Sequence, residues 1–467
     1  MTPTSISLNE VQVSEAEAIV SSSFEASLAE LAQLVRIPGI AWEAFDANQL
    51  EISAEAIAKL LRETGVFELV EIRRASVDGH LGSPAIVAQR LAKNWRPQIL
   101  LYAHHDVQPP GDESIWLTPP FEPTVKNGRM YGRGAADDKA GIVSHLAAIR
   151  TLAAVCGDDF DLGISIFIEG EEEAGSPTFR NFLEENRDIL KADAIVVADS
   201  GNWSETIPAL TATLRGLVSQ EIEIQTLDHA LHSGMYGGAV PDAMTAMIRV
   251  LASLHAEDGS VAVAGLHEGK AEDLPYSDED LRRDSGLLAG VSDIGSGTIL
   301  DRIWNKPAIT VIGIDAPSVS LSSNTMLPSA KAKISMRIAP GQDPAEALVA
   351  LRSHVEAHVP FGARLTFGET ELGKPFAVDD SGWASALARL ALKTAWAETP
   401  VNMGVGGSIP FIADLIEVFP EAQILVTGVE DPDSRAHSPN ESVHLESLRK
   451  TMLAEALLLI GGNAFSL

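Results

Sequence analysis

The sequence predicts an α/β protein in which a discontinuous main domain is interrupted by a smaller α+β domain. Three observations support this prediction. Buried-strand patterns alternate with a helical pattern in the first two hundred residues, one-sided strands dominate the middle of the chain, and buried-strand patterns return near its end. A chain of 467 residues also exceeds one ordinary hydrophobic core, so two domains are expected.

The first part of the chain is typical of a sheet covered by helices on both faces. Continuous apolar runs at 97–103, 162–168 and 194–198 predict buried strands. The apolar spacing of 140–155, between the first two runs, predicts a helix. Strands that alternate with helices in this way indicate a central, mixed sheet with its faces covered.

A change of pattern near residues 214–216 marks the start of the second domain. Several of its strands alternate apolar and polar side chains, as strands with one solvated face do. The expected order is strand, helix, strand, strand, helix and strand, at 217–225, 241–255, 308–314, 330–338, 344–358 and 363–368. Two βαβ-type halves predict a small ferredoxin-like α+β domain. The charged, Gly-rich residues 259–304 are predicted to be an insertion in it.

The pattern of the first part returns after residue 373, with a helix at 383–397 and a buried strand at 422–427. The simplest organisation therefore has three segments. Residues 1–213 form the first part of the main domain, 214–371 form the inserted domain, and 372–467 form the second part of the main domain.

Composition limits the classes of partner. The chain has 65 acidic and 34 basic residues, a formal charge of −31, which repels nucleic acid and anionic lipid. Cys156 is the only cysteine, so no internal disulfide is expected. No signal-peptide pattern opens the chain, and no stretch approaches the roughly 20 apolar residues of a membrane helix. We expect a cytoplasmic protein with neither nucleic-acid nor membrane partners.

Candidate metal ligands follow the predicted strands of the first part. The cluster His104–Asp106, the acidic run 169–176 and Asp199 each lie at or just beyond the end of a strand, and the carboxyl ends of such strands form the usual ligand crevice of an α/β sheet. The segment 132–139, which contains Asp137, opens a helix, and the segment 436–441, which contains His437, follows a late strand. Each residue has an ordinary explanation when taken alone: Asp137, for instance, could be a helix N-cap. The order and the strand-end positions of all of them together favour a shared site.

The sequence blocks around these residues carry a resemblance. HHDVQP, GRGAADDKAG, EGEEEAGS and VVADS, in this order, resemble the aminoacylase/carnosinase/carboxypeptidase G family of dinuclear zinc metallopeptidases. LHSGMYGG, NTMLPSAKAKISMR, GGSIP and AHSPNE resemble its carnosinase-like dipeptidase branch, and the similarity extends from about residue 84 to the end of the chain. The resemblance implies that the main domain is catalytic and that the inserted domain is a lid and dimerisation domain.

The resemblance also implies a set of metal ligands. His104 and Asp199 would bind one zinc ion, Glu173 and His437 would bind a second, and Asp137 would bridge the two. Nitrogen and oxygen ligands without thiolates suit catalytic zinc, and a metal pair can share and acidify one water molecule. Manganese or cobalt are possible substitutes.

The remaining catalytic assignments follow from the same blocks. Glu172 would be the general base, and Asp106 would orient His104. The peptide bond between Asp137 and Asp138 is cis in relatives. His232 would stabilise the oxyanion, and in relatives this histidine comes from the partner subunit of a homodimer formed through the lid.

Substrate recognition is expected from other residues of the same blocks. Arg337 would pair with a substrate carboxylate, and Thr325 and Ser408 would hydrogen-bond the substrate. Glu371 stands where the carnosinase-like branch has a histidine, which puts a preference for carnosine in doubt.

The predicted function is hydrolysis of the amide bond of a dipeptide, either broadly or of the Xaa-Gly or Cys-Gly type, by a metal-activated water. One alternative is deacylation of an N-acyl amino acid or an N-succinyl amine at the same site. A second alternative is a metal-binding homologue without activity, against which the presence of an unligated base such as Glu172 argues.

Overall fold

A six-stranded sheet organises the first of two compact units. The computed structural model describes residues 7–378, 381–407 and 410–467, and the first unit comprises Met1–Thr211, Val378–Met403 and Asp414–Leu467. The two pairings β1–β4 and β4–β8 are antiparallel. The three pairings β8–β5, β5–β9 and β9–β19 are parallel, so the sheet is mixed. In sheet order the strands are β1 (Leu69–Arg73), β4 (Ala85–Arg90), β8 (Gly163–Glu169), β5 (Gln98–His104), β9 (Ala194–Val197) and β19 (Gln423–Val426).

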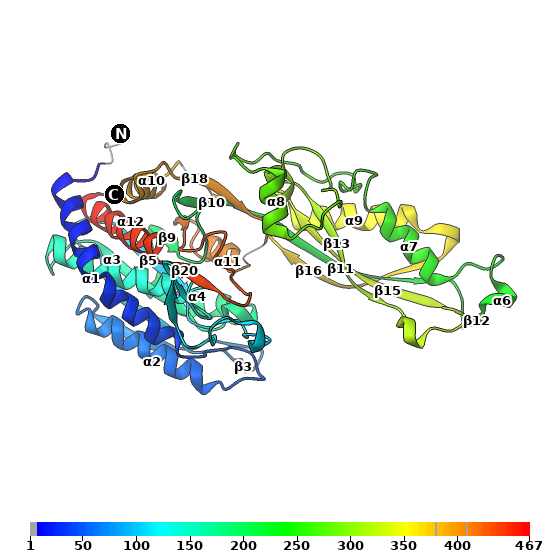
Figure 1. Cartoon of the computed structure of the whole chain (residues 1–467), viewed down its shortest axis with the longest axis horizontal. Helices are drawn as coiled ribbons and strands as arrows, with labels where there is room; N and C mark the ends of the chain where they lie inside the picture. Colours follow the sequence, from blue (N-terminus) through cyan, green and yellow to red (C-terminus); the bar gives the residue numbers. More distant parts are fainter. Residues whose placement is uncertain (1–6, 379–380, 408–409) are drawn as a thin grey trace. The chain divides into compact units, whose positions relative to one another are not determined.

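Helices cover both faces of this sheet, because the side chains on each face of its central strands are apolar. On β5, Leu101 and Ala103 join the core formed with the long helices (Figure 1). Tyr102 points to the opposite face, where its ring lies 5.5 Å from that of Phe167 and 5.9 Å from that of Phe179 of α4. The helices are α1 (Glu10–Val35), α2 (Asn48–Glu63), α3 (Lys139–Cys156), α4 (Phe179–Glu185), α5 (Arg187–Leu190), α10 (Trp383–Trp396) and α12 (Leu445–Ala464). Helix α11 (Pro410–Val418) is divided between the two units after Ala413.

Helix α3 is apolar on nearly all its faces because it packs inside the unit. Within the described residues it is the one helix long and apolar enough to cross a membrane, yet 72% of it is buried among other elements. It packs against β5, α1 and α12. An all-round apolar helix with these neighbours is a core helix.

The second unit is built on a four-stranded antiparallel sheet and comprises Ala212–Ala377 and Gly404–Ala413. On β15, Ala332, Ile334 and Met336 are buried in a core with α7 and α9, while Lys333 and Ser335 alternate with them on the other face. In sheet order the strands are β13 (Ala308–Asp315), β15 (Ser329–Ile338), β11 (Gly216–Gln225) and β16 (Arg364–Gly373). The helices are α6 (Ser233–Tyr236), α7 (Ala243–Ser253), α8 (Asp278–Ser285) and α9 (Pro344–His358).

This strand order and the two crossing helices are those of a ferredoxin-like α+β fold, so the predicted fold class of both regions is confirmed. Small sheets complete the chain. They contain β2 (Ser76–Val77), β3 (His80–Leu81), β6 (Thr124–Lys126), β7 (Arg129–Tyr131), β10 (Ala209–Leu214), β12 (Leu231–His232), β14 (Thr325–Met326), β17 (Phe376–Ala377), β18 (Val401–Val405) and β20 (Ser442–His444).

The second unit is larger than the predicted segment 214–371, because it also includes 212–213 and 372–377 at its two ends and a separate piece, 404–413. Residues 404–413 belong to the second unit, although the sequence analysis assigned them to the main domain. The physical reason is close packing: a Cβ atom at Gly404 would lie 2.5 Å from Trp304, and the Arg215 side chain donates a hydrogen bond to the Gly406 carbonyl oxygen (3.0 Å). The division into a catalytic and a lid domain stays a prediction.

Candidate dinuclear metal centre

The predicted ligands of the first unit meet at the carboxyl edge of its sheet. His104 is the last residue of β5, and Asp199 follows β9, the parallel neighbour of β5. Strand β8, on the other side of β5, leads into the 3-10 turn Glu172–Ala174. Because these three strands are parallel, their ends share one edge of the sheet. Three chain segments therefore deliver their side chains to one place.

The first group of candidate ligands contains His104, Asp137 and Asp199. The His104 Nε2 atom lies 2.9 Å from Asp137 Oδ1 and 4.0 Å from Asp199 Oδ1. Their ligand atoms all lie within 4.8 Å of one another. The His104 side chain has no exposed surface, whereas the side chain of Asp199 is 19% exposed. This spacing suits one cation.

The second group contains Asp137, Glu173 and His437. The His437 Nε2 atom lies 2.9 Å from Asp137 Oδ2 and 3.1 Å from Glu173 Oε2. Asp137 thus presents one carboxylate oxygen to each of the two imidazoles. Its side chain is 6% exposed, while that of His437 is 58% exposed. The two groups share the Asp137 carboxylate, which could therefore bind two neighbouring cations at once.

The charges of this cluster are crowded, and their pKa values shift accordingly. Burial, reinforced by the charges of Asp137 and Glu173, raises the pKa of Asp199 to about 7. Burial also raises the pKa of Glu172 well above its usual value, and the charge of Asp199 adds to this. Hydrogen bonds to Asp137 and Glu173 raise the pKa of His437 to about 11. Crowded carboxylates beside two imidazoles, without a thiolate, form a donor set that fits divalent metal ions.

Asp106 joins the two halves of the site. Its carboxylate oxygens accept hydrogen bonds from the backbone N–H groups of Glu172 (3.1 Å) and Glu173 (3.0 Å). The His104 Nδ1 atom lies 3.1 Å from the Asp106 carbonyl oxygen and 3.4 Å from its Oδ1 atom. Backbone and side chain of one residue therefore hold both the imidazole and the turn that carries Glu172.

Glu172 and Glu173 are adjacent residues of one 3-10 turn. The 3-10 turn ends at Gly175, which has a φ of 87°, a conformation that glycine adopts without the steric cost of a side chain. The Glu173 Oε2 atom accepts a hydrogen bond from Gln108 Nε2 (2.7 Å). Adjacent carboxylates on such a turn can serve different roles.

Two further carboxylates hold the backbone of candidate ligands, Glu441 at Asp137 and Asp138 at His104, and the sequence analysis did not single them out as site residues. The Glu441 Oε1 atom accepts hydrogen bonds from the backbone N–H groups of Ala136 (3.0 Å) and Asp137 (3.1 Å), while Arg133 Nη1 donates to its Oε2 atom (2.6 Å). Asp138 Oδ2 accepts a hydrogen bond from the His104 backbone N–H (3.1 Å). The peptide bond between Asp137 and Asp138 is cis. Glu441 is the last residue of the AHSPNE block, so its place in this block is the sequence feature that could have identified it as a site residue.

The predicted recognition residues of the second unit lie on two surfaces. His232 and Thr325 are directly opposite each other in the β12–β14 pair, and His232 Nδ1 accepts a hydrogen bond from the Gly234 N–H (3.1 Å). Arg337 pairs with Leu217 of β11, and Glu371 pairs with Ser219 of the same strand. Opposed residues of antiparallel strands point to the same face, so Arg337 and Glu371 share the sheet face that α7 and α9 leave open. Ser408 lies outside the described residues.

Two groups of candidate ligands that share Asp137 are typical of metal-dependent hydrolases with two cations. Residues 100–460 match Peptidase family M20/M25/M40, and the chain belongs to this family. It is therefore a metallopeptidase.

Three relatives illustrate the similarity. The chain is 36% identical over 419 residues to a cysteinylglycine-S-conjugate dipeptidase of Corynebacterium striatum, and the alignment covers 89% of this chain and 90% of the relative. It is 27% identical to a Beta-Ala-His dipeptidase of Rattus norvegicus, with 78% and 77% covered. The solved structure of the dipeptidase Dug1p of Saccharomyces cerevisiae matches with a TM-score of 0.76 at 22% identity, covering 97% of this chain and 99% of Dug1p. The last comparison supports the fold.

Proposed function

We propose that the first unit hydrolyses the amide bond of dipeptides with the aid of two divalent cations. His104 and Asp199 would hold one cation, Glu173 and His437 the other, and Asp137 both. The observation that carries this proposal is the Asp137 carboxylate, whose two oxygens each lie 2.9 Å from a different imidazole nitrogen. When bound, such a pair polarises the scissile carbonyl group and lowers the pKa of a water molecule.

Glu172 is the proposed general base. It takes a proton from the attacking water, whose oxygen forms a bond to the carbonyl carbon of the substrate. As the C–N bond breaks, Glu172 returns this proton to the leaving amine. Because Asp106 fixes the backbone N–H groups of both Glu172 and Glu173, it keeps the base beside the ligand without itself exchanging a proton.

Zinc is the proposed metal, with manganese or cobalt as possible substitutes. Two imidazoles with three carboxylates offer nitrogen and oxygen atoms only, a donor set that zinc accepts in catalytic sites. Magnesium and calcium prefer oxygen ligands alone, so two imidazoles disfavour them.

Dipeptides of the Cys-Gly type, including those with a substituted cysteine sulfur, are the proposed substrates. The support is the 36% identity to a cysteinylglycine-S-conjugate dipeptidase over nearly the whole length of both chains. Glu371 bears a negative charge where carnosine-cleaving relatives would have a histidine, and this disfavours Beta-Ala-His. We propose that Arg337, Thr325 and Ser408 bind the substrate.

We also propose a cytoplasmic homodimer in which His232 of one subunit stabilises the oxyanion formed at the other. His232 is exposed and lies on the short β12–β14 pair of the second unit. Mixing His232→Ala protein with Asp137→Asn protein should restore part of the activity that each lacks. Absence of rescue in a mixture shown to contain heterodimers would contradict action between subunits.

A substrate screen tests the function itself. Protein dialysed against zinc, manganese or cobalt is assayed with Cys-Gly, an S-alkyl Cys-Gly, Beta-Ala-His, an N-acetyl amino acid and an N-succinyl diamine. We expect the two Cys-Gly peptides to be cleaved fastest and metal analysis to give about two ions per chain. Preferential cleavage of the acylated compounds would establish a deacylase instead, and fewer than one ion per chain would refute the metal centre.

A further inference from the structure

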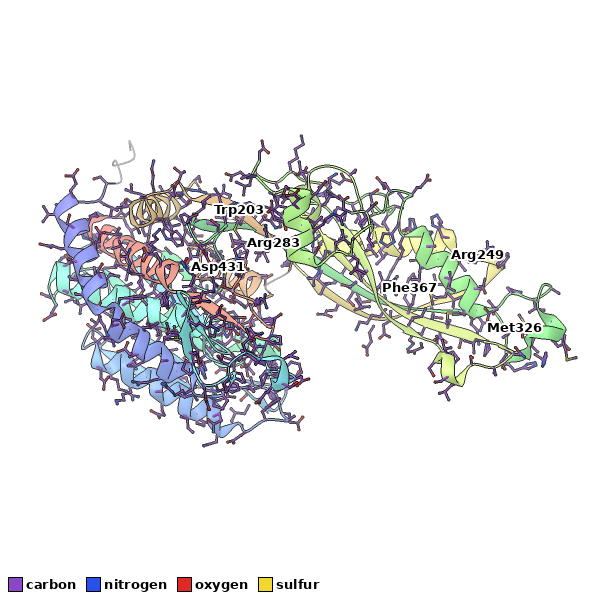
Figure 2. The ribbon with its side chains drawn as sticks, viewed as in Figure 1. Trp203, Arg249, Arg283, Met326, Phe367 and Asp431 are labelled. Carbon is purple, nitrogen blue, oxygen red and sulfur yellow. The ribbon has the colours of Figure 1, made fainter. Side chains whose placement is uncertain are left out.

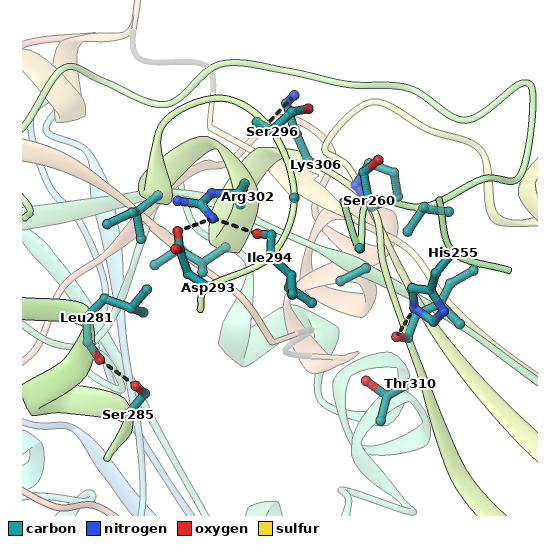
Figure 3. Close-up of a pocket in the computed structure, with 18 of the residues that line it drawn as sticks. His255, Ser260, Leu281, Ser285, Asp293, Ile294, Ser296, Arg302, Lys306 and Thr310 are labelled. Atoms are coloured by element: carbon teal, nitrogen blue, oxygen red, sulfur yellow. Dashed lines mark hydrogen bonds and ion pairs between the residues drawn. The ribbon is translucent and has the colours of Figure 1, made fainter. Parts of the chain in front are cut away.

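The second unit contains a cavity of about 510 Å³ that no predicted site residue lines. It lies between the insertion that carries α8 and the first half of β13 (Figure 3). Leu281 and Ser285 of α8 border one side, and His255 and Thr310 border the other. Cavities of roughly 300–1,000 Å³ hold small-molecule ligands. Its size is therefore that of a metabolite site.

The walls of this cavity are mostly aliphatic. Val261, Leu287 and Ile299 line it, together with Val291 and Ile294 of the insertion. Val291 is 46% exposed and Ile294 is 65% exposed, although both face a concave surface. A ligand with an apolar body would remove this surface from water, which is favourable.

Two of the three cations that line the cavity are neutralised within it. Arg302 Nη1 lies 2.8 Å from Asp293 Oδ2, and Lys306 Nζ lies 3.0 Å from Glu268 Oε2. The third cation is Arg215. Its partners among the described residues are backbone carbonyl oxygens: Nε donates to Gly406 (3.0 Å), and Nη1 donates to Arg302 (3.3 Å) and Lys306 (3.4 Å).

The cavity therefore carries one positive charge more than it neutralises, in a chain whose formal charge is −31. Burial and the neighbouring charge of Arg337 lower the pKa of Arg215 to about 10. Both effects disfavour the charged guanidinium, and a bound anion would offset both. A carboxylate matches one guanidinium in charge and shape, whereas a dianionic phosphate would leave a negative charge unbalanced.

We propose that this cavity is a binding site for small monocarboxylates with an apolar body, such as a medium-chain fatty acid or an aryl-alkyl carboxylate. The carboxylate pairs with Arg215, and the apolar body covers Val291 and Ile294. All its lining residues belong to the second unit, and none of them is a proposed metal ligand, catalytic residue or substrate-binding residue of the peptidase site.

Titration calorimetry of the full-length protein with 4-phenylbutyrate tests this proposal, with 4-phenylbutanol as the neutral control ligand. We expect saturable binding of the acid at one site per chain and at least about tenfold weaker binding of the alcohol, as for the loss of one charge-assisted hydrogen bond. Arg215→Gln should abolish the preference for the acid, while Arg215→Lys should retain part of it. Arg249→Gln is the matched control, since Arg249 projects from α7 of the same unit and does not line the cavity (Figure 2).

Ser285→Trp fills the cavity from its helical wall and provides a second test that leaves Arg215 intact. It should abolish the heat of 4-phenylbutyrate binding with no change in dipeptide hydrolysis. No saturable heat up to about 10 mM acid would overturn the proposal. Equal affinity for acid and alcohol would overturn it too, as would a binding heat that persists in full in Ser285→Trp, since that heat would come from another site such as the metal centre.

Discussion

The two units hold their predicted site residues in opposite physical settings. In the first unit His104 and Asp106 have no exposed surface, Asp137 is 6% exposed, and backbone hydrogen bonds hold the turn beside them. In the second unit His232 and Thr325 are exposed, and Arg337 and Glu371 lie on the open face of a sheet. Groups proposed to react are thus held by a core, whereas groups proposed to recognise substrate lie on accessible surfaces. Preorganisation in a buried site favours chemistry, and exposure permits exchange of substrate.

Buried polar contacts also hold the chain segment that leads to His437. Arg129 is buried between Asp431, whose Oδ2 atom lies 2.9 Å from Arg129 Nη2, and Ser442, whose hydroxyl accepts a hydrogen bond from Arg129 Nε (2.8 Å). These contacts tie the segment that carries His437 to β7. The His437 side chain is itself 58% exposed, unlike the other residues of the first unit compared above. Buried neighbours nevertheless hold the segment that carries it.

Loss of the proposed general base should have the largest effect on catalysis, and it tests whether the buried groups of the first unit carry out the reaction. Glu172→Gln should lower kcat by about 10²–10⁴-fold, because an amide cannot accept the proton of the attacking water. Bound metal should stay at the wild-type level, since Glu172 is not a proposed ligand. Steady-state kinetics and metal analysis measure both. Glu185→Gln, at an exposed position, is the control; a Glu172→Gln protein with wild-type kcat would refute the assignment.

Weakening the backbone clamp should have a smaller effect. Asp106→Asn keeps the size of the side chain but retains only one carbonyl oxygen for the N–H groups of Glu172 and Glu173. Metal affinity or activity should fall by about 10–100-fold. Competition with a chromogenic chelator measures the affinity, and Asp112→Asn on an exposed turn is the control. Unchanged affinity and activity would show that burial alone holds the turn.

Changes on the open sheet face should act on substrate binding. Arg337→Lys retains the charge but loses bidentate pairing with a carboxylate, so KM should rise by roughly tenfold while kcat stays within about threefold. Arg364→Lys, on β16 of the same sheet, should leave both constants unchanged. A fall in kcat at constant KM would break the division of roles between the two units.

The smallest expected effect concerns the core below the metal centre. Burial alone would lower the pKa of His145, but the Glu455 carboxylate, 2.6 Å from its Nδ1 atom, outweighs it and the net pKa is raised. A raised pKa contributes stability that is complete below the unfolded value of about 6.5 and is lost as the pH rises through the folded value. His145→Gln has no titrating imidazole at this position, so its stability lacks this contribution to the pH dependence.

Thermal unfolding between pH 6 and 9 measures this contribution. The Tm of the wild type should fall relative to that of His145→Gln by about 1–3 °C over this range. His229→Gln, at an exposed position of the second unit, should follow the wild type. A constant difference between wild type and His145→Gln would show that the pair does not exchange a proton in this range.

Much of the fold could be predicted because periodicity records burial. The buried runs at 97–103 and 162–168 became β5 and β8 within one residue, and the alternation at 330–338 became β15. Strand β16 extends to Gly373, five residues past its predicted end, because Glu371 and Leu372 are exposed on both faces of an edge strand and show no alternation. Helices α1 and α2 were not predicted, although their apolar faces pack on the same core.

The candidate metal site could likewise be predicted only in part. The amino-acid sequence alone determined which residue types follow which strands, and so which nitrogen and oxygen atoms were candidates for a shared centre. Only the tertiary structure decided that Asp137 presents one oxygen to each of two imidazoles, that Glu441 holds its backbone, and that Arg215 borders a cavity without a carboxylate partner among the described residues. The reason is physical: side-chain pattern reports the local burial of each residue, whereas distances between residues hundreds of positions apart depend on how whole elements pack.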